Sequence, residues 1–310
     1  MRFRNNYPHS PKGGFWKWKW DQLRGARAQA PAGGWRFETA RPDLVSNPAV
    51  TWIGHATVLL RVGGLSVLTD PHFSERASPL QFAGPRRVVP PVPGLAELPR
   101  IDAVLISHNH YDHLDLGSVV ALSRQPGGAP RYFVPLGLKG WFERQGIQDV
   151  VEMGWWDKTD YRGLELHFVP AQHWSKRTLS DDNLSLWGGW AVRHPELSFL
   201  FTGDTGYSPD FADIGARFGG FDLAAIPIGA YAPRWFMQIM HVNPAEAVQI
   251  HKDVRARQSM AIHWGTFENL TDESLYEPPE LLARESRKAG LADDEFFVLR
   301  HGETRAFART

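Results

Sequence analysis

The sequence of 310 residues contains no cysteine. Disulfide bonds and thiolate metal sites are therefore excluded, and any metal ion must be bound by histidine, aspartate or glutamate. The absence of cysteine does not by itself assign a cellular compartment. Histidine, in contrast, occurs 13 times. Any metal chemistry in this protein must therefore use imidazole and carboxylate ligands.

The sequence also lacks a charge excess and a long apolar segment. Its formal net charge is zero, whereas proteins that bind nucleic acid concentrate basic residues, so we expect no nucleic-acid partner. No segment approaches ~18 uninterrupted apolar residues, which argues against a membrane-spanning helix. The N-terminal residues lack the apolar core of a signal peptide. We therefore expect a cytoplasmic protein and leave peripheral contact with a membrane open.

The composition indicates one globular domain preceded by an arm. Hydrophobic residues make up 43% of the chain and charged residues 22%, which is enough to bury a large core. Residues 1–48 are rich in Gly, Pro, Arg and aromatic residues, and we interpret them as an irregular arm lying on the domain of residues 49–310. Residues 71–100 contain many prolines, which predicts a long surface loop.

Local patterns predict strands that alternate with helices. Gly63 and Gly64 separate two β-rich runs, which is typical of a hairpin. Asp115 is predicted to cap a helix that continues to about Arg124. The predicted strands are Thr57–Val62, Leu65–Thr69, Ala103–Ile106, Leu164–Val169, Trp187–Val192, Leu197–Phe201, Leu223–Ile226 and Met260–Ile262. Two sheets packed between helices fit this order best.

Two prolines mark further helix starts. Ser208 and Asn243 each precede a proline that we place at the first helical position, with the polar side chain as the cap. Glu246 lies three residues after Asn243, which resembles a capping box.

A cluster of metal-ligand types follows the strand that ends at Ile106. His108 and His110 are two residues apart, so their side chains can project to one side and bind one metal ion. Asp112 and His113 are adjacent and can serve a second ion. The alternative is a polar surface turn whose histidines are there by chance. We favour a site, because such a cluster directly after a buried strand is an expected location for one.

Three more candidate ligands follow other predicted strands. His173, Asp204 and His263 each lie after the end of a strand, where open α/β folds build their sites. Each residue alone is a weak signal, but together with the first cluster they complete a set of ligands for two metal ions. We assign His108, His110 and His173 to one ion and Asp112, His113 and His263 to the other, with Asp204 bridging. Imidazole and carboxylate ligands suit zinc, and also iron or manganese.

The chain resembles the N-acyl-phosphatidylethanolamine-hydrolysing phospholipase D family of the metallo-β-lactamase superfamily. The resemblance covers roughly residues 50–305 and is carried by the following segments: Trp52-Ile53-Gly54-His55-Ala56-Thr57, Leu68-Thr69-Asp70-Pro71, Ser107-His108-Asn109-His110-Tyr111-Asp112-His113-Leu114-Asp115, Gln172-His173-Trp174, Phe201-Thr202-Gly203-Asp204-Thr205-Gly206-Tyr207, Gly229-Ala230-Tyr231-Ala232-Pro233-Arg234-Trp235-Phe236-Met237 and Ala261-Ile262-His263-Trp264-Gly265-Thr266. It implies a four-layer αββα sandwich, a dizinc site and hydrolysis of a phosphodiester.

The resemblance also implies roles for individual residues. His241 matches a family histidine near the substrate, and we expect it to bind the phosphate or assist the leaving group. Asp112 and Asp204 would hold the metal ions and orient a bridging hydroxide that attacks phosphorus. His55 and Asp70 would orient the ligands. Two alternatives remain open: a lactonase or other carboxyl-ester hydrolase on the same site, and a non-catalytic lipid-binding protein.

The arm has an aromatic segment of its own. Trp16, Trp18 and Trp20 alternate with Lys17 and Lys19, so an extended chain would carry the tryptophans on one face. That face would suit the interface of a phospholipid bilayer, with the lysines near anionic head groups. Alternatively, the tryptophans pack on the protein itself. The sequence does not fix the oligomeric state, and a homodimer is compatible with it.

Overall fold

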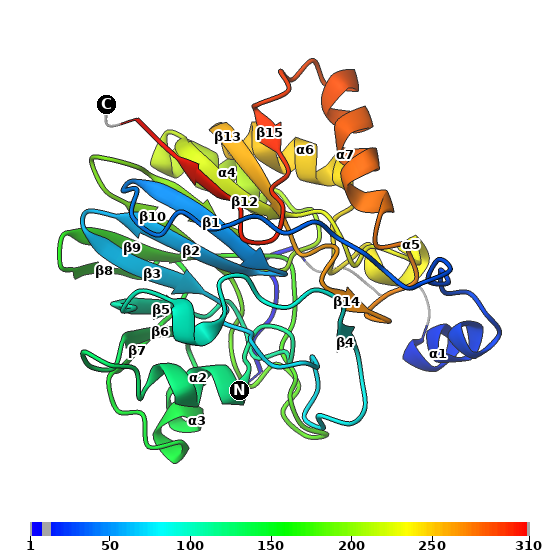
Figure 1. The fold of residues 1–310 in the computed structure, drawn as a ribbon, viewed down its shortest axis with the longest axis horizontal. Coiled ribbons are helices and arrows are strands. Elements are labelled where there is room, and N and C mark those ends of the chain that lie inside the picture. Colours follow the sequence, from blue (N-terminus) through cyan, green and yellow to red (C-terminus); the bar gives the residue numbers. More distant parts are fainter. Residues whose placement is uncertain (1, 8–13, 309–310) are drawn as a thin grey trace.

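The first of two large β-sheets carries the N-terminal half of the fold. In the computed structural model, which describes residues 2–7 and 14–308, this sheet has the strand order β16-β1-β2-β3-β5-β6-β7 (Figure 1). Its strands are β1 (Ala49–Gly54), β2 (Thr57–Val62), β3 (Leu65–Thr69), β5 (Ala103–Leu105), β6 (Arg131–Pro135), β7 (Val150–Met153) and β16 (Thr304–Ala306). The pairs from β3 to β7 are parallel, so the carboxyl ends of these strands meet at one edge.

The second sheet faces the first and has the order β15-β13-β12-β11-β10-β9-β8. Its strands are β8 (Lys158–Tyr161), β9 (Leu164–Val169), β10 (Gly189–Arg193), β11 (Phe199–Phe201), β12 (Phe221–Pro227), β13 (Ala256–Ile262) and β15 (Phe296–Phe297). The pairs from β11 to β15 are parallel. A small third sheet pairs β4 (Arg86–Arg87) with β14 (Phe267–Glu268).

Helices cover the outer face of each sheet. The first sheet packs against α2 (Leu116–Leu122) and α3 (Lys139–Arg144), and the second against α4 (Asp210–Phe218), α6 (Pro244–Asp253) and α7 (Glu277–Lys288) (Figure 1). The remaining helices are α1 (Phe15–Leu23), α5 (Arg234–Met237) and the short 3-10 turn η1 (Leu95–Glu97). Because β1 and β2 are covered on both faces, every one of their residues is buried. The expected αββα sandwich is confirmed.

Most local predictions are confirmed by the structure. The β2–β3 hairpin turns at Gly63 and Gly64, whose φ angles of 60° and 76° suit glycine at both turn positions. Asp115 caps α2 by accepting the backbone N–H of Ser118. Asn243 and Glu246 form the predicted capping box of α6. Residues 71–100 contain only β4 and η1 as regular structure.

The prediction for the start of α4 is wrong by one position. Pro209 is the residue before the helix rather than its first member, and α4 begins at Asp210. The Ser208 hydroxyl donates to the Asp210 carboxylate at 2.8 Å instead of accepting a backbone N–H. The Ser208 hydroxyl therefore binds the neighbouring Asp210 carboxylate instead of capping the helix as the sequence pattern predicts.

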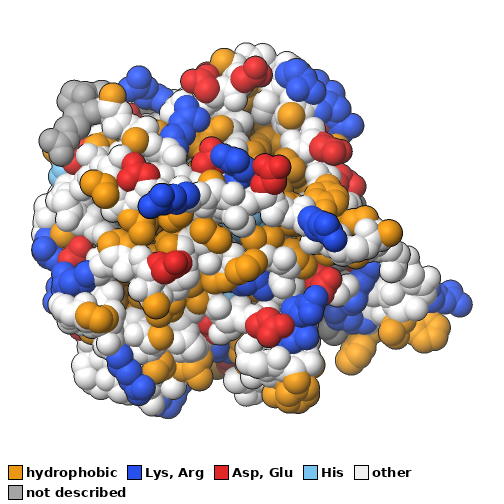
Figure 2. Space-filling view, in the orientation of Figure 1, with side chains coloured by type: hydrophobic (Ala, Val, Ile, Leu, Met, Phe, Trp, Pro, Cys, Tyr) orange, Lys and Arg blue, Asp and Glu red, His pale blue; other side chains and the backbone are white. Residues whose placement is uncertain are grey.

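The extended conformation expected for Trp16, Trp18 and Trp20 is also wrong, because these residues belong to helix α1. In a helix, residues two apart point to nearly opposite sides, whereas residues four apart share a side. Trp18 accordingly turns inward and is only 7% exposed, while Trp16 and Trp20 are 82% and 58% exposed. Figure 2 shows α1 projecting from the body with hydrophobic and basic side chains on its outer surface.

Candidate metal centre

The predicted ligands come together where the loops after β5, β9, β11 and β13 meet. The loop after β5 carries the segment from His108 to His113, and the other loops bring His173, Asp204 and His263. All seven side chains are buried or nearly so. Because the strands end at a common edge of the two facing sheets, residues far apart in the sequence become neighbours.

Three imidazoles form the first part of the centre, called here the trihistidine group: His108, His110 and His173. Nδ1 of His110 lies 2.9 Å from Nε2 of His108 and 3.2 Å from Nε2 of His173. Two imidazole nitrogens this close can share at most one proton between them, so the lone pairs of the group converge on one point. This is the arrangement that a cation bound by three histidines requires.

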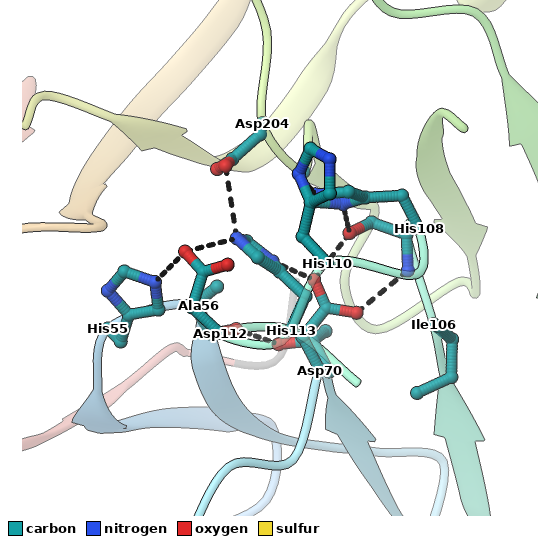
Figure 3. A network of polar contacts seen from close by, with 12 residues as sticks. His55, Ala56, Asp70, Ile106, His108, His110, Asp112, His113 and Asp204 are labelled. Atoms are coloured by element: carbon teal, nitrogen blue, oxygen red, sulfur yellow. Dashed lines mark hydrogen bonds and ion pairs between the residues drawn. The ribbon is translucent and has the colours of Figure 1, made fainter. Parts of the chain in front are cut away.

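The second part, called here the carboxylate group, consists of Asp112, His113 and His263. Oδ2 of Asp112 lies 3.4 Å from Nε2 of both histidines. Asp204 lies between the two groups. Its Oδ2 is 3.0 Å from Nε2 of His113 (Figure 3). The same oxygen is 4.0 Å from Nε2 of His173, and Oδ1 is 3.1 Å from Nε2 of His263. One carboxylate therefore reaches both groups, as a bridging ligand must.

The buried polar atoms of the centre fit divalent cations. Nε2 of His113, Nε2 of His263, Nδ1 of His241 and Oδ1 of Asp204 are buried without a hydrogen bond of acceptable geometry. Nε2 of His113 and Nε2 of His263 nevertheless lie 3.0 and 3.1 Å from Oδ2 and Oδ1 of Asp204. A buried polar atom without a partner costs ~1–3 kcal/mol. Several such atoms pointing at one centre are explained when a cation accepts their lone pairs. The His/Asp cluster is thus suited to bind divalent metal.

The two groups differ in protonation. Burial and the neighbouring imidazoles lower the pKa of His110 to about 3, and burial lowers the pKa of His173 to about 4. Burial also lowers the pKa of His263, but Asp204 and Asp112 outweigh this effect and raise it to about 9. The same carboxylates raise the pKa of His113 well above its usual value. The trihistidine group is therefore neutral and the carboxylate group forms ion pairs.

Two further residues hold the carboxylate group in place. Oδ2 of Asp70 accepts a hydrogen bond from Nδ1 of His113 at 2.7 Å, and the Ser107 backbone and hydroxyl donate to the same carboxylate (Figure 3). This bond fixes which nitrogen of His113 faces the centre. Nε2 of His55 lies 3.0 Å from Oδ2 of Asp112. His55, Asp70 and His263 also have positive φ angles, a strain that proteins concentrate at functional sites.

His241, which was expected outside the seven ligands, forms a further group with His173 and Asp204 whose possible ligand atoms lie within 4.8 Å of one another. Its Nδ1 is 3.8 Å from Oδ2 of Asp204, and its ring centroid is 5.2 Å from that of His173. Its backbone N–H donates to the carbonyl of Met237 in α5, and Arg234 donates to its carbonyl at 2.8 Å. Arg234 is itself fixed by its Nη2, which lies 2.8 and 2.7 Å from the two carboxylate oxygens of Glu246. These backbone contacts fix the position of the His241 imidazole at the edge of the site, beside Asp204 and His173.

The sequence analysis missed one residue at this site, Asn5, whose amide contacts the backbone of His173. No sequence signal could have found it, because a lone asparagine in an arm has no motif. Asp115 serves as the predicted cap of α2.

Two facing sheets, helices on both outer faces and a His/Asp centre at the strand ends define a protein of the metallo-β-lactamase fold. Residues 66–264 match the model of the Beta-lactamase superfamily domain. The chain is 45% identical over 264 residues to N-acyl-phosphatidylethanolamine-hydrolyzing phospholipase D 1 of Caenorhabditis elegans, a match that covers 82% of this chain and 74% of that protein. The chain belongs to this phospholipase D family within the beta-lactamase superfamily.

Two other proteins extend the comparison. The mitochondrial N-acyl-phosphatidylethanolamine-hydrolyzing phospholipase D of Saccharomyces cerevisiae is 38% identical over 250 residues, covering 78% of this chain and 53% of that protein. Among solved structures, Igni18, a metallo hydrolase from the archaeon Ignicoccus hospitalis, has a TM-score of 0.64 at 20% identity and covers 84% of this chain and 99% of that chain. The similarity to Igni18 supports the fold alone.

Proposed function

We propose that this protein is a two-metal phosphodiesterase of phospholipase D type that hydrolyses N-acyl-phosphatidylethanolamine or a related phospholipid. The observation that carries this proposal is the pair of ligand groups joined by Asp204, in a chain 45% identical to a phospholipase D of that substrate. The expected products are phosphatidic acid and an N-acylethanolamine.

The proposed centre takes two divalent ions, with zinc the favoured metal and iron or manganese the alternatives. The trihistidine group would hold one ion, the carboxylate group the other, and Asp204 both. When bound, such ions supply Lewis acidity and a hydroxide at neutral pH. The imidazole donors and the lack of cysteine agree with a zinc, iron or manganese site.

The chain's own residues would orient the substrate and hold the centre rigid. Asp112 and Asp204 sit where they can accept a hydrogen bond from the attacking group while they fix their neighbours. His241, at the rim and 3.8 Å from Asp204, can donate a hydrogen bond to a phosphoryl oxygen or to the leaving oxygen. Asp70 keeps Nε2 of His113 aimed inward through its bond to Nδ1.

Helix α1 supplies a route to a lipid substrate. Among the described residues, no helix is long and apolar enough to cross a bilayer. The outer side of α1 exposes Trp16, Trp20 and Leu23, and Arg24 lies beside them, a combination suited to a phospholipid surface. The inner side is anchored, because Nε1 of Trp18 donates to Asp272.

The anchoring of α1 also brings it close to His241. The Trp18 ring stacks on Phe236 of α5 at 5.3 Å, and α5 is the helix whose carbonyl at Met237 receives the His241 N–H. A bilayer bound to the outer side of α1 would therefore lie near the rim of the proposed site.

One comparison of substrates tests the proposed reaction. The zinc-loaded protein is incubated with N-acyl-phosphatidylethanolamine, a generic phosphodiester and an acyl lactone, and turnover is measured for each. We expect the phospholipid to be hydrolysed fastest, with activity lost on chelation and restored by zinc. Turnover of the lactone alone would identify a carboxyl-ester hydrolase. No turnover of any ester by metal-loaded protein would identify a lipid-binding protein.

A matched pair of variants tests the membrane contact. Changing Trp16 and Trp20 together to alanine should weaken binding to phospholipid vesicles and lower activity on them, yet leave the melting temperature and activity on a short soluble phosphodiester intact. Trp18→Ala should instead lower the melting temperature, because Trp18 is packed on the domain. Unchanged vesicle binding by a stable Trp16/Trp20 variant would exclude this contact.

A further inference from the structure

The N-terminal residues 2–7, called here the strap, run along the segment that carries His173. The backbone N–H of Phe3 donates to the carbonyl of Asn183 at 2.9 Å, and the Gln172 side chain donates to the carbonyl of Tyr7 at 2.8 Å. The strap is therefore fixed on both sides of His173 through contacts with residues far away in the sequence.

Asn5, in the middle of the strap, binds both backbone polar groups of His173. Its Nδ2 donates to the carbonyl of His173 at 2.9 Å, and its Oδ1 accepts the backbone N–H of His173 at 3.2 Å. A single side chain thus satisfies the donor and the acceptor of one residue. His173 lies beyond the end of β9, outside the hydrogen-bond ladder of the sheet.

A second contact fixes the orientation of the Asn5 amide. Nε1 of the buried Trp187 donates to Oδ1 of Asn5 at 2.9 Å. If the amide were turned over, its NH₂ group would face two donors, the indole N–H and the His173 N–H. The indole N–H is shared with the carbonyl of Ala171 at 3.0 Å, and both N–H donors favour the orientation in which the amide complements the backbone of His173.

The imidazole of His173 is fixed separately from its backbone. Its Nδ1 lies 2.9 Å from the carbonyl of Met240, an acceptor, so Nδ1 carries the proton and Nε2 is left with its lone pair toward His110. Met240 sets the rotation of the ring, whereas Asn5 sets the position of the residue that carries it. Both are needed to place Nε2 in the trihistidine group.

From these contacts we infer that Asn5 is a positioning residue of the metal centre, holding His173 so that its Nε2 completes the trihistidine group. The inference rests on the proposed function, because it gives His173 a metal to bind. It assigns the strap a role in the site, although it lies in the arm outside the catalytic domain. Asn5 and Asp70 have similar roles. Asp70 accepts a hydrogen bond from the ring of His113, whereas Asn5 binds the backbone of His173.

The test measures metal affinity rather than turnover. Metal-free protein is titrated with Co²⁺ while its visible absorption is followed, and Zn²⁺ affinity is measured by competition with a chelator. Asn5→Leu keeps a similar volume but removes every hydrogen bond of the amide. We expect it to lower the affinity for one of the two metal ions by roughly tenfold to a hundredfold, as for other residues that orient ligands. The affinity for the other ion should stay unchanged.

Two further variants make the test specific. Asn6→Leu, on the same strap, removes the bond from Asn6 to Asp210, the one side-chain hydrogen bond that Asn6 makes within residues 2–7 and 14–308, and should leave the binding of both metal ions unchanged. Asn5→Asp keeps the acceptor but places an oxygen against the His173 carbonyl, so it should also weaken the one equivalent. If Asn5→Leu does not fold, Asn5→Asp decides the question by the same criterion.

The identity of the affected equivalent is checked in a His173→Ala background. There, Asn5→Leu should have no further effect on metal binding, because the ligand that it positions is gone. Wild-type affinities and an unaltered Co²⁺ spectrum in a folded Asn5 variant would overturn the inference, as would equal weakening of both equivalents. If the wild-type protein itself binds no metal, the proposed function fails instead.

Discussion

The trihistidine group and the carboxylate group lie side by side but hold their ligands ready by different means. His110 and His173 are neutral because burial and neighbouring imidazoles lower their pKa values to about 3 and about 4. His263 instead forms close ion pairs with Asp204 and Asp112, which raise its pKa to about 9. One group is thus free to bind a cation at neutral pH, whereas the other must release a proton first.

The supports behind the two groups also differ. In the carboxylate group, the Asp70 carboxyl group contacts the ring of His113, and burial raises the pKa of Asp70. In the trihistidine group, neutral groups position the ligand. The carbonyl of Met240 contacts the ring of His173, and the amide of Asn5 contacts the backbone of His173. The two supports also meet, because the Ser107 hydroxyl donates to Asp70 and lies 2.9 Å from Nδ1 of His108. Only Asp204 belongs to both groups.

The shared position of Asp204 predicts the largest effect. Asp204→Asn should keep the fold but lower turnover by about a hundredfold to a thousandfold, since a neutral amide is a poor bridge between two cations and metal Lewis acidity lowers the activation barrier by several kcal/mol. Activity and metal content are measured together. Asp293→Asn, on an exposed surface carboxylate, is the control. Near-wild-type turnover in Asp204→Asn would contradict the bridging role.

A substitution of Asp70 should have an effect of intermediate size, and it should affect metal binding at one group more than at the other. Asp70→Asn should weaken metal binding at the carboxylate group by about tenfold to a hundredfold, because His113 loses its carboxylate hydrogen-bond partner. The effect at the trihistidine group should be smaller, because Asp70 reaches His108 only through Ser107. Chelator competition measures both equivalents. Equal weakening of the two equivalents would mean that Asp70 stabilises the whole edge of the sheet rather than one group.

His241 should affect turnover without affecting either group. We expect His241→Ala to lower turnover by about tenfold or more while both metal equivalents stay bound, since positioned proton donors contribute on this scale. Elemental analysis and initial rates check this, with Gln238→Ala on the exposed side of the same segment as the control. Loss of one metal equivalent would show that His241 is itself a ligand.

The raised pKa of His263 predicts a smaller, pH-dependent effect in the metal-free protein. Its folded-state value of about 9 exceeds the ordinary value of 6.5. The stabilisation from its protonated form is therefore complete below about pH 6.5 and is lost as the pH rises through about 9. Between these values the melting temperature of metal-free protein should fall by a few degrees more than that of His263→Gln. If the melting temperatures of the two proteins fell in parallel with pH, the result would contradict an ion pair of His263 with Asp204 and Asp112.

The sequence was sufficient to predict the parts of the site that depend on local pattern. Each strand that ends before a candidate ligand has an apolar run, so the positions of His108, His173 and Asp204 at strand ends followed from the pattern and the known behaviour of such folds. The caps at Asp115 and Asn243 were equally local, because each acts on an N–H three residues away.

What the sequence could not supply depends on long-range contacts. Asn5 and His173 are 168 positions apart, and nothing in the pattern of either segment links them. The Trp-Lys alternation of residues 16–20 suggested an extended chain, but Trp18 is drawn inward by Asp272 and Phe236, and this contact fits a helix. In both cases tertiary packing decided what local propensity left open.

The central claim is that both ligand groups must be filled for the reaction. The most direct measurement adds zinc stepwise to metal-free protein and follows, in the same samples, bound zinc per chain and hydrolysis of N-acyl-phosphatidylethanolamine. The account predicts little turnover up to one equivalent if the trihistidine group fills first, and a rise to a plateau at two. Full turnover at one equivalent, or turnover without metal, would contradict it.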